Sequence, residues 1–286
     1  MMISFIIEDF MLKINKYSLI KNAAILGVAS LSLSLLATTN SFSDGHIYGE
    51  NNPVTVKGYK GSKTDSTAYT GQIARQLQHN SLKKIVSKGN PNDPSSSTLN
   101  KMMNYFENKD KSKSMAILDP KSSSKFPVKQ KMVGEISTGA NLAGKADKRS
   151  QLSWPNNMSG ADVIRFMIKK ASKTSGGVDM RNGMNYPQLI SKYTMGAVLY
   201  HQACDNYLDE KMTANNKPNN KPYKKGAYYT GKEHSWDEAF GYWGAAAHTM
   251  KLSAQQSYDV AKKKNLKAAD FNNDGVVDLY KEMTYG

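Results

Sequence analysis

The sequence has a single cysteine, Cys204, among 286 residues. One cysteine excludes an internal disulfide, so no covalent cross-link within the chain stabilises the fold. Common catalytic signatures are also missing: the chain contains no His-Glu-x-x-His, no Gly-x-Ser-x-Gly, no Gly-x-x-x-x-Gly-Lys-Ser/Thr and no Gly-x-Gly-x-x-Gly. No alternation of polar and apolar residues is long enough to predict a useful strand. The lack of strand patterns favours a helical fold. The lack of these signatures means that no complete set of catalytic residues is recognisable in the sequence.

Residues 1–43 have the three parts of a cleavable signal peptide: a basic start, a short apolar core at 23–37 and a small-residue cleavage site at 41–43. Acidic residues before Met11 do not suit a basic start, which indicates translation from Met11. The core is shorter than the about 20 residues of a membrane span, so we expect cleavage rather than a retained anchor helix. The basic start comprises Lys13, Lys16 and Lys21.

The signal peptide predicts a periplasmic or secreted chain of residues 44–286, with no transmembrane anchor after cleavage. The net charge of +15 raises the question of an anionic partner. The lysines are scattered among serine, asparagine and glycine, as at 121–131 and 215–225, and no nucleic-acid-binding module is recognisable. This distribution is typical of solvated loops, and we expect no nucleic-acid partner. Weak attraction to an anionic cell envelope is the alternative that the charge supports.

Apolar residues recur at the helical period along much of the chain, between stretches rich in glycine, proline and serine. The long polar stretches at 108–158 and 213–229 are typical of loops. We therefore predict an all-α fold, a bundle of helices with long polar loops. The helices are expected at about 72–88, from Ser97, from Ser159, and at about 186–212, 233–251 and 253–264.

The longest expected helix, 186–212, has Pro187 in its first turn, where the missing N–H of proline costs little. It carries a continuous apolar stripe, so we expect Cys204 to be a buried small hydrophobic residue. The stripe comprises Leu189, Ile190, Tyr193, Ala197, Tyr200, Cys204, Tyr207 and Leu208.

Residues 270–282 begin with Asp-Phe-Asn-Asn-Asp-Gly-Val-Val-Asp, which predicts a calcium-binding loop. Calcium takes oxygen ligands, and Gly at position six allows the tight turn that gathers alternate side chains around the ion. Position twelve, which normally holds a bidentate Glu, is Lys281 here. We expect a structural calcium site; the alternative is a polar turn without a metal. The expected ligands are Asp270, Asn272, Asp274, the Val276 carbonyl, Asp278 and Glu282, with Val277 packed against the domain.

A second candidate site lies on the helix expected from residue 233, where His234 shares a face with Asp237 and Glu238. A histidine and a carboxylate one turn apart are a common way to offer two ligands to iron or zinc. His201 lies on the preceding helix, and it would complete a cluster if the two helices pair. The alternative is that the acidic residues favour the helix N-terminus through its dipole and that His234 is hydrogen-bonded in the core.

Four segments carry a resemblance to known proteins: 68–75 (AYTGQIAR), 188–202, 229–242 (YTGKEHSWDEAFGY) and 270–279. In this order they resemble a family of bacterial secreted proteins, a domain of unknown function grouped with imelysin-like proteins. The most specific part is the Glu-His-Ser-Trp-Asp-Glu-Ala-Phe-Gly-Tyr block, and the resemblance covers about residues 66–286. Family members continue with further helices after the calcium-type loop, so the resemblance implies a chain that is truncated or naturally short at its C-terminus.

The resemblance implies an imelysin-like helical bundle and an iron-related function in the cell envelope. It also implies a Gly-x-His-x-x-Glu motif, in which His234 matches the histidine and Asp237 occupies the glutamate position. Gly231 lies one residue too far upstream to match the glycine.

Three functions follow from these features. The first is an exported, non-enzymatic helical protein that binds calcium structurally and offers a transition-metal site at His234. The second is a metal-dependent hydrolase or peptidase-like enzyme with His234 as ligand and Glu238 as base. The third is an interaction module that binds the cell envelope or a protein partner through its basic loops and uncovered helix faces.

Overall fold

The computed structural model describes residues 53–93, 96–109, 115–124, 126–151, 153–215, 218–244 and 246–285. The predicted signal peptide, residues 1–43, lies outside the described residues. Helices dominate the regular secondary structure of the described residues, whose strands form one short antiparallel hairpin, which confirms the all-α prediction. No helix within these ranges is both long enough and apolar enough to cross a membrane.

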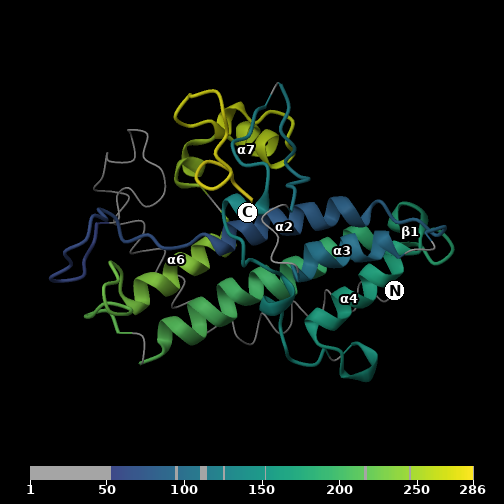
Figure 1. Ribbon diagram of the computed structural model, residues 1–286, viewed down its shortest axis with the longest axis horizontal. Coiled ribbons are helices and arrows are strands. Elements are labelled where there is room, and N and C mark those ends of the chain that lie inside the picture. The colour runs from purple at the N-terminus through teal and green to yellow at the C-terminus, as the bar shows by residue number, and fades with distance from the viewer. Residues whose placement is uncertain are drawn as a thin grey trace. The chain divides into compact units, whose positions relative to one another are not determined.

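Figure 1 shows the helices, and their sequence explains where several of them begin. Ser159 accepts a hydrogen bond from the backbone N–H of Asp162 and so caps α4, as its position before an apolar run predicts. The α-helices are α2 (Gly71–Val86), α3 (Ser97–Glu107), α4 (Gly160–Ser172), α5 (Tyr186–Thr194), α6 (Gly231–Trp243) and α7 (Ala254–Ala261). The π-helix η6 (Met195–Lys211) continues α5, and strands β1 (Val178–Asp179) and β2 (Met184–Asn185) precede it. Short 3-10 turns are η2 (Val133–Glu135), η3 (Ala143–Lys145), η4 (Pro155–Asn157), η5 (Ser175–Gly177), η7 (Ala247–Lys251) and η8 (Lys267–Ala269).

The main core lies between α2, α3, α4, α5, η6 and α6, with α6 packed along η6 and α2 in contact with α3, α5 and α6. Tyr207 of η6 and Phe106 of α3 are among its largest fully buried side chains. Burying such aromatic side chains is the largest single contribution to a core of this kind. The core therefore holds α6 against both η6 and α2.

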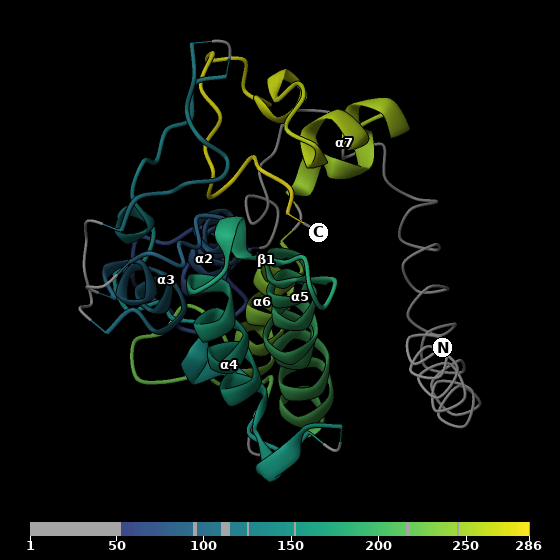
Figure 2. The ribbon, with the colours of Figure 1, turned by 90° about the vertical axis from the view of Figure 1, so that its right-hand side faces the viewer.

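A second core joins the long loop after α3 to the C-terminal segment, and Figure 2 shows the two running beside each other. Val128 and Val277 form a parallel bridge, in which Val277 donates to Pro127 and accepts from Lys129. Val277 is buried, as predicted for position eight of the calcium-type loop. The C-terminal loop is thus fastened to the rest of the chain by backbone pairing as well as by apolar contact.

The apolar stripe predicted for 186–212 is only partly buried. Leu189, Tyr200 and Leu208 are exposed, and Cys204 is half-buried against the main core. The physical reason for Tyr200 and Leu208 is that η6 has i→i+5 hydrogen bonds, so residues that share one face of an α-helix are turned away from one another. At Leu189, the neighbouring Ile190 takes the buried position.

The prediction of a single helix over 233–251 is wrong, because α6 ends at Trp243. Gly244 adopts φ +76° and ends α6, and its N–H bonds to the carbonyl of Phe240. A glycine in the left-handed region is a common way to end a helix, since it has no Cβ to clash there. Residues Ala247–Lys251 then form the separate 3-10 turn η7 instead of continuing α6.

Candidate functional site

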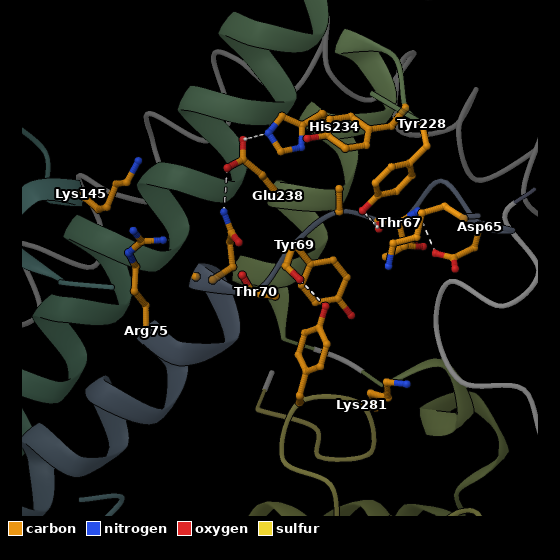
Figure 3. A pocket seen from close by; sticks show the side chains of 16 residues that line it. Asp65, Thr67, Tyr69, Thr70, Arg75, Lys145, Tyr228, His234, Glu238 and Lys281 are labelled. Atoms are coloured by element: carbon orange, nitrogen blue, oxygen red, sulfur yellow. Dashed lines mark hydrogen bonds and ion pairs between the residues drawn. The ribbon is translucent and has the colours of Figure 1, made fainter. Parts of the chain in front are cut away.

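A cavity of about 690 Å³ lies where the start of α2, the start of α6 and the segment before α2 meet. Figure 3 shows its side chains, with His234 and Glu238 on one wall and Arg75 and Lys145 on another. The wall opposite carries Lys281, from the end of the calcium-type loop. The cavity is lined by Lys63, Asp65, Thr67, Ala68, Tyr69, Thr70, Gly71, Gln72, Arg75, Lys145, Tyr228, Tyr229, His234, Glu238, Tyr280 and Lys281.

Two of the predicted metal-binding residues, His234 and Glu238, point into this cavity from α6. The distance from His234 Nε2 to Glu238 Oε2 is 3.6 Å, and Gln72 Nε2 of α2 donates to Glu238 Oε1 at 2.9 Å. The rings of Tyr223 and Tyr229 lie 4.7 and 4.8 Å from the imidazole of His234. These contacts hold both side chains in place, and the pair can supply two ligands to a metal or pass a proton between ring and carboxylate.

The third predicted residue of this helix, Asp237, lies apart from the cavity wall. Its side chain is 4% exposed, and its Oδ2 accepts a hydrogen bond of 2.8 Å from the backbone N–H of Ala68. Asp237 thereby fastens the segment that precedes α2 to α6. Its carboxylate serves the architecture of the cavity rather than the pair formed by His234 and Glu238.

His201 lies in a different place, although η6 and α6 do pack together as the cluster hypothesis required. Its Nδ1 is 3.1 Å from Asp205 Oδ2, and Asp205 also pairs with Arg149. His201 lines a separate cavity of about 400 Å³ that does not include His234. Throughout the described ranges, no three His, Cys, Asp or Glu residues are grouped so that they could hold a metal ion. The iron or zinc site therefore stays a prediction with two candidate ligands, His234 and Glu238.

The calcium-type loop is folded by the hydrogen bonds that its side chains accept from nearby backbone. Asp270 Oδ2 accepts from the N–H of Gly275 at 3.0 Å, and Asn272 Oδ1 accepts from Asp274 at 2.9 Å. Asp274 Oδ1 in turn accepts from Val276 at 2.8 Å. Gly275 has φ +83°, so the position predicted to need glycine does adopt the left-handed conformation.

Two carboxylates of the loop are held by other groups in this conformation. Asp278 accepts from Lys129 Nζ at 3.1 Å and from Gln130 Nε2 at 2.9 Å, and these contacts lower its pKa although burial opposes the shift. Glu282 is 1% exposed, and its two oxygens accept the backbone N–H groups of Phe271, Asn272 and Asp278. Burial raises the pKa of Glu282.

Asp270 differs from these residues, because its Oδ1 is buried and has no hydrogen-bond partner. A buried carboxylate oxygen without a donor is costly, and a bound cation would satisfy it. The backbone turn and the oxygens of Asp270, Asn272 and Asp274 fit a hard cation, whereas Asp278 would have to exchange Lys129 for the ion. The fit is thus good for the first half of the loop and conditional for the second.

Sequence reasoning did not single out Arg75 and Lys145, which lie on the wall of the cavity beside His234 and Glu238. Arg75 lies in the helix predicted for 72–88, and it is only 8% exposed although arginine usually lies at the surface. An arginine within an apolar helical pattern is the signal that could have marked it, because arginine is rarely buried without a role. Lys145 lies in a long polar loop and carries no such signal.

One comparison with known proteins gives a match. A family model described as "Domain of unknown function (DUF4856)" matches residues 48–278, most of the chain, including the cavity wall up to Glu238 and the loop up to Asp278. No match to this chain was found among curated proteins or among solved structures.

Proposed function

Since the chain belongs to the family described as a domain of unknown function, DUF4856, we propose its function from the loop itself: it is an exported, non-enzymatic protein that binds one calcium ion in residues 270–282. The ion has a structural role and fastens the C-terminal segment. Export follows from the signal-peptide pattern of residues 1–43, and calcium is abundant outside the cytoplasm. A site with modest affinity would be filled there.

The buried, unpartnered Oδ1 of Asp270 is the observation that carries this proposal. The three preceding hydrogen bonds from backbone N–H groups already place Asp270, Asn272 and Asp274 on one tight turn, so little ordering remains to be done on binding. Lys129 competes with calcium for Asp278, because its ammonium group forms an ion pair with the Asp278 carboxylate. The proposal therefore includes the exchange of Lys129 for calcium at Asp278.

Calcium at about ten times its Kd should stabilise the protein by about 1.4 kcal/mol, since it binds the folded state. For a chain of this size that corresponds to a rise in Tm of roughly 3–5 °C. Calorimetric titration with calcium after treatment with a chelator measures the affinity, and thermal melts with and without calcium measure the shift. Asp270→Asn should abolish both effects, whereas Lys129→Gln should tighten calcium binding because the competing cation is gone.

Asp259→Asn is a suitable control, because it removes one carboxylate from α7, outside the loop. A melt that chelator leaves unchanged, together with no heat of calcium binding, would contradict the proposal. Equal calcium affinity of the original chain and of Asp270→Asn would contradict the assignment of the ligand even if calcium binds.

The pairing of His234 with Glu238 favours a second candidate, a transition-metal site in the cavity. The resemblance to imelysin-like proteins supports an iron-related envelope role for such a site, and a metal-dependent hydrolase is the related enzymatic version. Both versions require further ligands from outside the described residues or from a bound molecule. Metal analysis of protein purified without chelator should find iron or zinc that His234→Ala loses and His201→Ala retains. Absence of either metal from the original chain would remove this candidate.

A further inference from the structure

Arg75 is a buried cation for which no carboxylate partner occurs in the described part of the chain. Its side chain is 8% exposed, its Nε donates to the carbonyl of Asn141 at 2.9 Å, and its guanidinium lies 5.7 Å from the ring centre of Tyr242. The guanidinium lines the cavity described above. A buried guanidinium is costly unless it is paired, so this arrangement indicates that an anion completes it.

Lys145 brings a second cation to the same wall. Figure 3 shows its side chain next to that of Arg75, and no ion pair of Lys145 with a described residue is found. Burial lowers the pKa of Lys145 and repulsion by Arg75 adds to the shift, although the negative charge of Glu238 opposes it. Two neighbouring cations repel one another, and an anion bound between them would offset that cost.

The N-terminus of α2 adds a third source of positive potential. Thr70 makes no side-chain cap, and the first turn of α2 contains no acidic residue, so its free N–H groups have no side-chain acceptor of their own. A methyl group added at Gly71 would lie 3.1 Å from Arg75 Nη1, which places the guanidinium directly beside this helix start. Arg75 and the helix N-terminus thus converge on one side of the cavity.

The acidic residues of the cavity are fewer than its cations and offset this potential only in part, with Glu238 acting on Lys145. Glu238 is engaged by Gln72 and lies beside His234, and Asp65 accepts the backbone N–H of Thr67. Among the residues that line the cavity, four are Lys or Arg and two are Asp or Glu. The remaining walls carry the tyrosine rings of Tyr69, Tyr228, Tyr229 and Tyr280.

We propose that this cavity binds a small organic anion, with its carboxylate or phosphate group held by Arg75, Lys145 and the N-terminus of α2. Arginine offers paired donors that match the oxygens of either group, and the N–H groups of a helix start serve anions in the same way. The tyrosine rings contact the organic part of the ligand, since aromatic faces accept flat or ring-shaped groups. Arg75, Lys145 and the start of α2 lie outside residues 270–282. The test uses protein freed of calcium and then desalted to remove the chelator, so the two proposals fail independently.

Calorimetric titration of the full chain with inorganic phosphate, acetate and phenyl phosphate tests the proposal. We expect saturable binding, with phenyl phosphate bound more tightly than inorganic phosphate because its ring contacts the tyrosines. If phosphate binds more tightly than acetate, the site recognises a phosphate group; if acetate binds more tightly, it recognises a carboxylate. The proposal would be overturned if none of the three probes showed saturable binding up to concentrations on the order of 10 mM. A Kd weaker than that corresponds to negligible specific recognition.

Three variants separate a binding role from a structural one. Lys145→Gln should weaken binding of the best probe about tenfold, because one charge-assisted contact is lost, while its Tm without ligand stays equal or rises, because a buried, repelled charge is removed. Glu238→Gln should tighten binding, because it removes a competing negative charge. Lys148→Gln is the matched control, since Lys148 lies three residues further on, is exposed and does not line this cavity. Equal affinities of Lys145→Gln and Lys148→Gln would overturn the assignment.

Discussion

Replacing Glu282 by alanine should lower the free energy of unfolding by about 3 kcal/mol, even when no calcium is present. The carboxylate is 1% exposed and accepts the backbone N–H groups of Phe271, Asn272 and Asp278, which lie at both ends of the calcium-type loop. Removal leaves three donors without their acceptor, and each buried, unsatisfied donor costs about 1–3 kcal/mol. Relief of the buried charge offsets part of that cost, because burial raises the pKa of Glu282. Urea unfolding in excess chelator measures the loss.

This result would show whether Glu282 stabilises the loop through its hydrogen bonds or acts as a calcium ligand. If Glu282 mainly closes the loop, Glu282→Ala destabilises the chain equally with and without calcium, whereas Asp270→Asn loses only the stabilisation that calcium provides. Asp274→Asn is the control within the loop, because the side chain is exposed and an amide oxygen can still accept from Val276. A loss below about 1 kcal/mol for Glu282→Ala in chelator would show that the three hydrogen bonds are readily replaced by water.

The features that sequence predicted best are those that depend on residues close together in the chain. The start of α4 at Ser159 follows from a cap whose partner, Asp162, is three residues away. The tight turn at Gly275 follows from the loop motif, and the burial of Val277 follows from its position within that motif. Local hydrogen bonds and backbone preferences determine such features, so the order of residue types is sufficient to predict them.

The features that sequence missed depend on contacts between distant segments. Arg75 and Lys145 meet because η3 packs on η6 and α3 while α2 packs on α3 and α6, and no local pattern encodes that meeting. Glu282, one residue beyond position twelve, was predicted as a calcium ligand, but the backbone N–H groups that its oxygens accept were not predicted. The hypothesis that linked His201 to His234 was correct about the packing of η6 against α6. The two side chains nevertheless line different cavities, since helices that pack together still direct residues to several sides.

Acidification should destabilise the protein well above the pH at which most carboxylates titrate, and His79 should be the main cause. Its side chain is 7% exposed, and its Nε2 lies 3.1 Å from the carbonyl oxygen and from Oγ of Ser191. Burial, with a smaller contribution from three neighbouring lysines, lowers the pKa of His79 from 6.5 to about 4 in the folded protein. Between these two pKa values the unfolded chain binds a proton that the folded chain does not. These lysines are Lys83, Lys263 and Lys192.

The free energy of unfolding therefore falls as the pH falls in this range, because the unfolded state gains protons that the folded state does not. The stabilisation is present above about pH 6.5 and is lost towards pH 4. Each unit between the two pKa values is worth about 1.4 kcal/mol, so the loss at pH 5 is about 2 kcal/mol and approaches about 3 kcal/mol at pH 4. Urea unfolding at a series of pH values should reveal this slope, and His79→Gln should remove most of it, because the amide keeps a donor but binds no proton. A smaller slope of the same sign should persist from His248, whose pKa burial also lowers, and Glu282 opposes both because its pKa is raised. An unchanged slope in His79→Gln would show that His79 is hydrated or becomes protonated in the folded protein.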